Sequence, residues 1–156
     1  MRRIALAWIL LSLLLGCSRK PPYQGRSVAD LERMLEDANP SVRVQGAFGL
    51  GLLGEKAKPA VPALARALGS SDTLVRQQAA VSLGQIGVAA EDAVPALITA
   101  LGDREWTVRR QAAVALGKMG ASARTAETAL RRCERDTSTL VRQAAAEALL
   151  RIQPQK

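Results

Sequence analysis

The fold is decided by the stretch VPALARALGSSDTLVRQQAAVSLGQIG (residues 61–87), which recurs as VPALITALGDREWTVRRQAAVALGKMG (residues 94–120), 33 residues further along the chain. Outward from this pair, the dipeptide Val-Arg keeps the same spacing at residues 42–43, 75–76, 108–109 and 141–142. Two further columns stay in register, Ala47, Ala80, Ala113 and Ala146, and Leu50, Leu83, Leu116 and Leu149. Four copies without an insertion between them predict a stack of repeats.

Each period contains two predicted helices. The first is short, as in residues 61–68, and has proline near its start, where the missing backbone N–H costs no hydrogen bond. The second follows a polar turn; Asn39 is expected to cap it in the first repeat, with Pro40 as the first helical residue. It ends near Gly54, Gly87 or Gly120, which suit the left-handed residue after a helix.

No segment alternates with period two, so no strand is predicted. The expected fold is all-α, a right-handed α-solenoid of four two-helix repeats with a 33-residue period, built by residues 28–153. The repeats occupy about residues 28–60, 61–93, 94–126 and 127–153. The fourth repeat has Glu127, Thr128 and Glu134 where the others carry apolar residues or proline, and such polar replacements are typical of a terminal repeat. The stack is expected to stop there.

Composition argues against an enzyme. The 156 residues are 48% hydrophobic but only 3% aromatic, and they include no histidine, the commonest general base and metal ligand. The two cysteines, Cys17 and Cys133, are too few for a zinc cluster. Cys133 shares a first-helix column with Met34, Ala67 and Ala100, so we expect a buried apolar residue there rather than a nucleophile. No catalytic residue, metal site or cofactor is predicted.

The amino terminus has the pattern of an export signal. Two arginines precede the apolar run of residues 4–15, and these twelve residues fall short of the roughly 20 that span a bilayer. The tetrapeptide LLGC at residues 14–17 resembles the lipobox of bacterial lipoproteins. The resemblance implies a signal peptide at residues 1–16, a lipid on Cys17 and a flexible tether at residues 17–27. The alternative is an ordinary cleaved signal peptide with an unmodified cysteine.

The lipobox resemblance also implies a location. It describes an exported bacterial lipoprotein, anchored in a membrane and facing the periplasm. Ser18 follows the cysteine where aspartate would resemble an inner-membrane retention signal, so the outer membrane is favoured.

The repeats carry the signature of a known family. The pattern Asp-x4-Val-Arg at residues 37–43, 103–109 and 136–142 resembles HEAT repeats, and the short period with Ala-Leu-Gly endings is most similar to the variety named after phycobilisome lyases. The resemblance implies a structural ladder of charge pairs along the stack. Its predicted members are Asp37, Arg43, Arg76, Asp103, Arg109, Asp136 and Arg142.

The second repeat departs from this pattern. Ser70 stands where aspartate is expected, with Asp72 as the alternative partner in that rung. The arginine column could instead form a phosphate-binding stripe, but an acidic residue at a fixed distance favours the ladder.

The resemblance further implies that the second helices line a concave face. Positions opposite the buried column give an apolar strip with a polar surround, a composition that suits a protein partner. The predicted binding residues are Phe48, Val81, Val114, Gln78, Gln111, Arg110, Lys118 and Trp106. Trp106, in the turn before a second helix, is either an exposed anchor or folded over the neighbouring turn. The alternative for the whole face is a solvated surface that binds nothing.

These features predict a non-enzymatic lipoprotein of the bacterial envelope that acts as an adaptor or scaffold. Its expected partners are a protein or peptide on the concave face and the membrane through the lipid. The net charge is +8 from 22 basic and 14 acidic residues, but the basic residues are scattered, and export keeps the chain from chromosomal DNA. No nucleic acid is therefore expected. The alternatives are a lyase-like or enzyme-associated role, or a basic surface that binds nucleic acid or anionic head groups.

Overall fold

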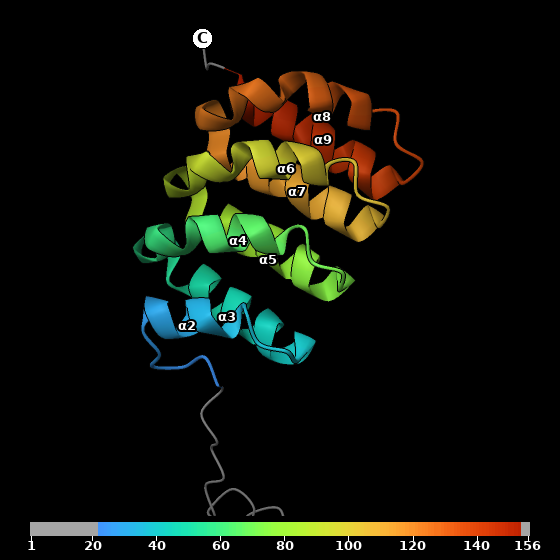
Figure 1. The fold of residues 1–156 in the computed structure, drawn as a ribbon. Helices are drawn as coiled ribbons and strands as arrows, with labels where there is room; N and C mark the ends of the chain where they lie inside the picture. Colours follow the sequence, from blue (N-terminus) through green and yellow to red (C-terminus); the bar gives the residue numbers. More distant parts are fainter. Residues whose placement is uncertain (1–21, 154–156) are drawn as a thin grey trace, which may run out of the picture.

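Four helix pairs stack into a solenoid (Figure 1). The computed structural model describes residues 22–153, and these contain no strand. The first helices of the four pairs are α2 (Val28–Met34), α4 (Val61–Ala67), α6 (Val94–Ala100) and α8 (Glu127–Cys133). The second helices are α3 (Pro40–Leu52), α5 (Thr73–Ile86), α7 (Trp106–Met119) and α9 (Thr139–Ile152). The predicted all-α solenoid is confirmed.

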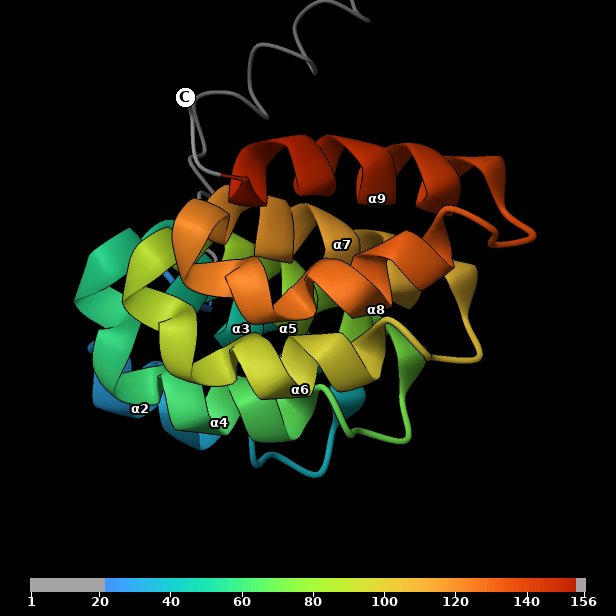
Figure 2. The ribbon, with the colours of Figure 1, turned by 90° about the horizontal axis from the view of Figure 1, so that it is seen from above.

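The helices form two layers with the core between them. Seen along the stack, α2, α4, α6 and α8 lie in one layer and α3, α5, α7 and α9 in the other (Figure 2). Leu50, Leu83 and Leu116 are fully buried, as their shared column predicts. Alanine fills the same interior, which accounts for the scarcity of aromatic residues. Ala146 is exposed, because no repeat among the described residues covers the far side of α9.

Local sequence sets where the second helices begin and end. The Asn39 Oδ1 accepts a hydrogen bond from the Ser41 N–H at 2.9 Å, and the Asp72 Oδ1 accepts from two N–H groups of α5. Ser138, which occupies the same column, makes no capping bond from its side chain. The predicted glycines Gly54, Gly87 and Gly120 have φ of 55°, 70° and 59°. A residue with a Cβ would be strained there.

A 3-10 helix connects each repeat to the next. These connectors are η1 (Gly54–Ala60), η2 (Gly87–Ala93) and η3 (Gly120–Ala126), and they lie along one edge of the stack (Figure 1). The sequence analysis did not predict them. The signal is alanine at every third position after the glycine, for example Ala90 and Ala93 after Gly87, and all these alanines are buried. A 3-10 helix has three residues per turn, so this spacing places them on one side.

Glycine also sets how closely the second helices pack. A Cβ on Gly84 of α5 would lie 2.9 Å from the Ala115 Cα of α7, and one on Gly117 would lie 3.0 Å from the Ala148 Cα of α9. The first helices stand further apart, and a cavity of about 430 Å³ separates α4 from α6. Because the second helices are closer together, the stack curves toward them. We call α3, α5, α7 and α9 the inner layer.

The fourth repeat breaks the glycine column. Leu150 occupies the position of Gly51, Gly84 and Gly117, and its side chain is 71% exposed. The close approach that Gly84 and Gly117 allow is therefore not available at this position of α9.

At the other end of the stack, the chain folds back over the first repeat. Residues 22–25 form a turn, and the Tyr23 ring packs edge to face on Phe48 of α3, with 5.0 Å between ring centroids. Gly49 provides the room, because a Cβ there would lie 2.8 Å from the Tyr23 Cβ. Tyr23 is thus packed against the first repeat, although it lies in the segment that the sequence predicted to be a flexible tether. The predicted signal peptide and Cys17 lie outside the described residues.

Within residues 22–153, one stretch, Thr73–Ala100, is long and apolar enough to cross a membrane by length and composition alone. It comprises α5, η2 and α6, and it is interrupted at Gly87, where φ is 70°. Its large apolar residues include Leu83 and Leu97, both fully buried. This stretch is apolar because many of its residues form part of the core between the repeats.

Candidate binding surfaces

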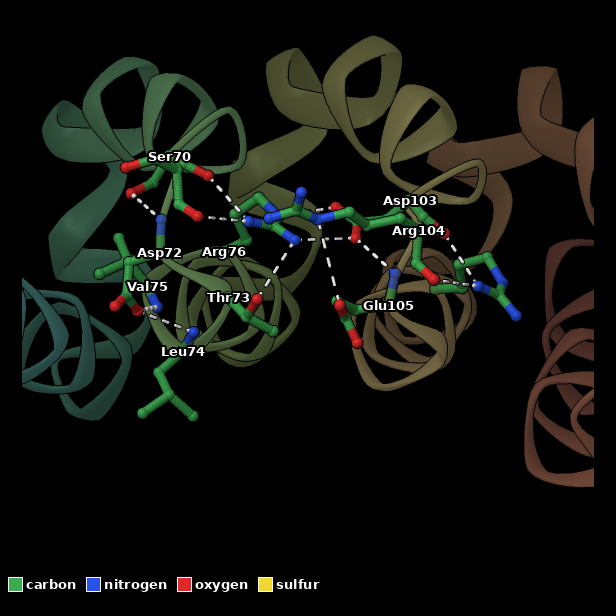
Figure 3. A network of polar contacts seen from close by, with 11 residues as sticks. Ser70, Asp72, Thr73, Leu74, Val75, Arg76, Asp103, Arg104 and Glu105 are labelled. Atoms are coloured by element: carbon green, nitrogen blue, oxygen red, sulfur yellow. Dashed lines mark hydrogen bonds and ion pairs between the residues drawn. The ribbon is translucent and has the colours of Figure 1, made fainter.

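The charge ladder connects one repeat to the next. Arg76 of α5 donates from Nε to the Asp103 Oδ2 at 2.7 Å and from Nη2 to the Asp103 Oδ1 at 3.0 Å. Arg109 of α7 makes the same two bonds to Asp136, at 2.7 and 2.8 Å. Each aspartate lies 27 residues after its arginine, in the loop of the following repeat. Figure 3 shows Arg76 reaching across to Asp103.

The two rungs are buried and fully hydrogen bonded. The Arg76 and Asp103 side chains are only 7% and 10% exposed. The Nη1 of Arg76 is held by the carbonyl oxygens of Ser70 and Ser71, so the guanidinium also ties α5 to the loop before it (Figure 3). Such pairs contribute more to a single register than to net stability, because desolvation offsets much of the Coulomb attraction. This arrangement favours a structural role over a phosphate-binding stripe.

The pKa values of both aspartates lie below the usual value for aspartate. Burial raises the pKa of Asp103, but hydrogen bonds from Arg76 and from the Glu105 N–H, with the nearby positive charge, outweigh it and leave the pKa below its usual value. The hydrogen bond from Arg109 lowers the pKa of Asp136, and the bond from the Ser138 N–H adds to this against burial. The carboxylates thus serve as fixed anions in the loops.

The other predicted ladder residues form no rung among the described residues. Asp37 accepts from the Asn39 N–H at 2.8 Å and pairs with no arginine. Arg43 donates to main-chain oxygens of its own loop, and the residue 27 positions after it is Ser70, which is too short to pair with it. Asp72 does not substitute, because its carboxylate caps α5. Arg142 bonds only its own loop and the Thr139 hydroxyl.

The predicted binding residues lie together on the inner layer. Those on α3, α5 and α7 are partly exposed, except Trp106 and Lys118, which are exposed; they are Phe48, Gln78, Val81, Trp106, Arg110, Gln111, Val114 and Lys118. The apolar strip is less accessible than sequence suggested. Phe48 is covered by Tyr23, and Val114 packs against the core.

Other exposed apolar side chains of this layer lie in the first turns of the second helices, and Leu52 and Leu150 are exposed near the opposite ends of α3 and α9. Leu74 of α5 is 64% exposed, and Trp106 and Leu140 are 43% and 45% exposed at the starts of α7 and α9. Leu74 borders a groove of about 280 Å³ between α3 and α5, with Pro40, Val44 and Gln45 on the other side. Leu74 is not among the binding residues predicted from the sequence.

Metal-ligand clusters and the thiol of Cys133 are the two chemical features to consider among the described residues. Residues 22–153 contain no group of three or more Cys, Asp or Glu side chains that could hold a metal. Cys133 is buried against the Leu101 carbonyl, and burial raises the pKa of its thiol, with Asp136 adding to the shift. A buried thiol with a raised pKa is a poor nucleophile.

Comparisons with known proteins agree with this architecture. The sequence profile of HEAT repeats matches residues 28–94 and 87–150. An engineered protein of known structure is similar, with a TM-score of 0.68 and 26% identity over 80% of this chain and 62% of the other. The complex of CpcE and CpcF of phycocyanin lyase from Nostoc sp. PCC7120 is similar, with a TM-score of 0.66 and 27% identity over 80% of this chain and 52% of the other. The chain therefore spans less than two thirds of either structure. A search of the curated proteins finds no significant match.

Proposed function

The chain belongs to the HEAT-repeat family, and from this premise we propose that it is a non-enzymatic scaffold that binds another protein on its inner layer. The observation that carries the proposal is the set of exposed apolar side chains at the starts of α5, α7 and α9, Leu74, Trp106 and Leu140. Large apolar side chains beside glutamine and arginine are the composition of protein interfaces, in which a few anchors supply most of the affinity.

The site has the shape such an anchor requires. The groove beside Leu74 is bounded by side chains of both α3 and α5, so it is formed only when two repeats stack. The strip of Val81 and Val114 continues along the same layer, with Gln78 and Arg110 beside it. A partner that spans this layer would contact several repeats at once. Similarity to a chain of the CpcE and CpcF complex, in which two proteins associate, supports this use of the fold.

The test replaces an anchor without disturbing the core. Leu74→Glu should abolish capture of the proteins that the tagged wild type recovers from membranes, and circular dichroism should remain unchanged. Val88→Glu is the matched control, because Val88 is similarly exposed but lies on η2, at the opposite edge of the stack. Equal recovery by both variants and the wild type would exclude the inner layer as the docking surface.

We propose further that the scaffold is attached to a membrane of the bacterial envelope by a lipid on Cys17, facing the periplasm, with the outer membrane favoured. The support is the sequence LLGC after a short apolar run. A fatty-acid probe should label the wild type and Cys133→Ala but not Cys17→Ser. Cys133 is the control because alanine fills its column in two other repeats. Labelling of Cys17→Ser would contradict the proposal.

A second candidate is a subunit of an enzyme complex. The similarity to a phycocyanin lyase chain favours it, although this chain covers 52% of that one. The same capture experiment separates the two roles. Recovery of an enzyme whose activity depends on this chain would support the second candidate, and a partner whose activity is independent of it would support the scaffold.

A further inference from the structure

The junction between the first and second repeats lacks a carboxylate that the next two junctions have. Asp103 and Asp136 each occupy the loop position that receives an arginine from the preceding repeat. At the first junction this position is Ser70. The Ser70 Oγ still accepts from the Asp72 N–H, as the Asp103 Oδ1 accepts from the Glu105 N–H, so the turn itself is preserved. Only the acid that would meet Arg43 is missing.

Arg43 is nevertheless held in the same way as the paired arginines. Its Nη1 donates to the Asp37 oxygen at 2.8 Å and to the Ala38 oxygen at 3.1 Å. The equivalent bonds of Arg109 measure 2.8 and 3.2 Å. In Arg109 this leaves Nε and Nη2 directed at the aspartate of the following repeat. In Arg43 the same two donors have no partner among the described residues, and no carboxylate there lies within 4.0 Å of them.

A cavity of about 200 Å³, open to solvent, lies at the first junction. It is lined by Arg43 and Ser70 and, from α2, α4 and α5, by Leu35, Glu36, Ala63, Arg66, Ala67 and Val75. Since a water molecule takes up about 30 Å³, this volume holds about six waters, enough for a carboxylate and a short apolar stem. The corresponding space between α4 and α6 is bordered by Asp103, and Arg76 does not line it.

Charge in the cavity favours an anion. Arg43 and Arg66 contribute two positive charges, and Glu36 contributes one negative charge. Glu36 approaches Arg66 at 3.8 Å, and both side chains are mostly exposed, so this ion pair is weak. Arg43 is thus a rigidly placed guanidinium whose free edge faces an accessible cavity. The planar fork of arginine matches the two oxygens of a carboxylate.

We propose that this cavity binds a carboxylate, which Arg43 grips through Nε and Nη2 as Arg76 grips Asp103. The carboxylate is supplied from outside, either by a small free acid or by an aspartate or glutamate side chain of a peptide. The site shares no lining residue with the groove beside Leu74, so it does not depend on the inner layer being a docking surface. Its occupant would complete a rung that the sequence leaves open.

The test follows the Arg43 Nε–Hε signal by NMR, assigned through its absence in Arg43→Gln. Acetate and a blocked Ala-Asp-Ala peptide serve as the two carboxylate probes, and inorganic phosphate is the competing anion. We expect both carboxylates to shift the signal in a saturable manner. The probe with the lower Kd identifies the source as free acid or peptide. No shift with either carboxylate, or a lower Kd for phosphate than for both, would overturn the proposal.

Ser70→Asp supplies the missing acid from within the chain. It should pair with Arg43, raise the Tm and weaken carboxylate binding at least about tenfold, the fold-change expected from competing for a hydrogen bond to a charged group. Ser71→Asp is the control, because it adds the same charge at the exposed neighbouring position. Arg43→Lys keeps the charge but not the fork, and should also weaken binding. If Ser70→Asp and Ser71→Asp bind carboxylate equally well, Arg43 is not the receptor. Leu74→Glu should leave carboxylate binding unchanged. A failure of the proposed docking surface can therefore be distinguished from a failure of the carboxylate site.

Discussion

Gly84 of α5 faces Ala115 of α7 so closely that a Cβ on the glycine would lie 2.9 Å from the alanine Cα. Ala115 is itself fully buried, with no free space to move into. The glycine therefore acts as a spacer between two repeats. In a helix interior it would otherwise be unfavourable, because alanine has the higher helix propensity.

Gly84→Ala should accordingly destabilise the protein. Propensity alone predicts a gain of about 1 kcal/mol, but overpacking costs about 1–3 kcal/mol, and the backbone of α7 cannot yield locally. Urea unfolding should show a lower midpoint. Gly102→Ala is the control: its Cβ would meet only the Thr99 carbonyl at 3.4 Å, an ordinary contact. An increase in the stability of Gly84→Ala would mean that the inner layer is looser than described.

Removing the acid from a rung should be costly. Asp103→Asn keeps an acceptor for the Glu105 N–H but leaves the Arg76 guanidinium buried without a counter-charge. Breaking a buried pair in this way costs about 3–5 kcal/mol. Asp37→Asn is the matched control, because Asp37 makes the same turn bond without an arginine partner. Chemical denaturation measures the free energy of unfolding of both variants. Equal decreases would mean that the Arg76–Asp103 pair does not stabilise the fold.

The same carboxylates make stability depend on pH. Their pKa values in the folded protein are lowered, whereas an unfolded aspartate titrates near 3.9. The stabilising contribution is therefore complete above about pH 4 and is lost as the pH falls through the lower folded values. The Tm should decline in acid less steeply for Asp103→Asn with Asp136→Asn than for the wild type. Parallel curves would contradict this assignment.

The aromatic pair at the first repeat should couple two distant segments. Tyr23 and Phe48 meet edge to face, an arrangement that contributes about 0.5–1.5 kcal/mol beyond buried area. A double-mutant cycle with Tyr23→Ala and Phe48→Ala should yield a coupling energy in this range. Additive losses would mean that the turn at residues 22–25 packs independently of Phe48.

The repeats were predictable because their signal is redundant. A leucine such as Leu83 is buried at the same place in each repeat, so the residues that recur every 33 positions are those of the core. In the 3-10 connectors the buried alanines recur every three residues, but each connector has only seven residues. So short a pattern is hard to distinguish from the spacing of an α-helix. Tyr23 was missed because its packing requires no repeat, only the space that Gly49 leaves.

The partners of the ladder were harder to assign than its members. The sequence places Asp37 six residues before Arg43, and the resemblance implied pairs along the stack without giving the partner of each residue. Three-dimensional stacking brings each arginine against the next loop, 27 residues on, where Asp103 meets Arg76. The spacing in the sequence identifies the ladder residues, but their pairing depends on how the repeats stack. The exposure of Leu74 likewise depends on how α3 and α5 stack, which local spacing does not contain.

Because Arg76 and Arg109 each pair with an aspartate of the following repeat, whether two repeats can form a charge pair depends on both of them together. Excising residues 61–93 would remove one whole period and place Arg43 opposite Asp103, while Arg109 and Asp136 would keep their contact. Excising residues 94–126 would bring Arg76 against Asp136 but retain the unmatched Arg43 and Ser70. The two shortened chains would have equal length but different numbers of junctions with an arginine–aspartate pair. Which repeats are neighbours therefore matters as well as how many repeats there are.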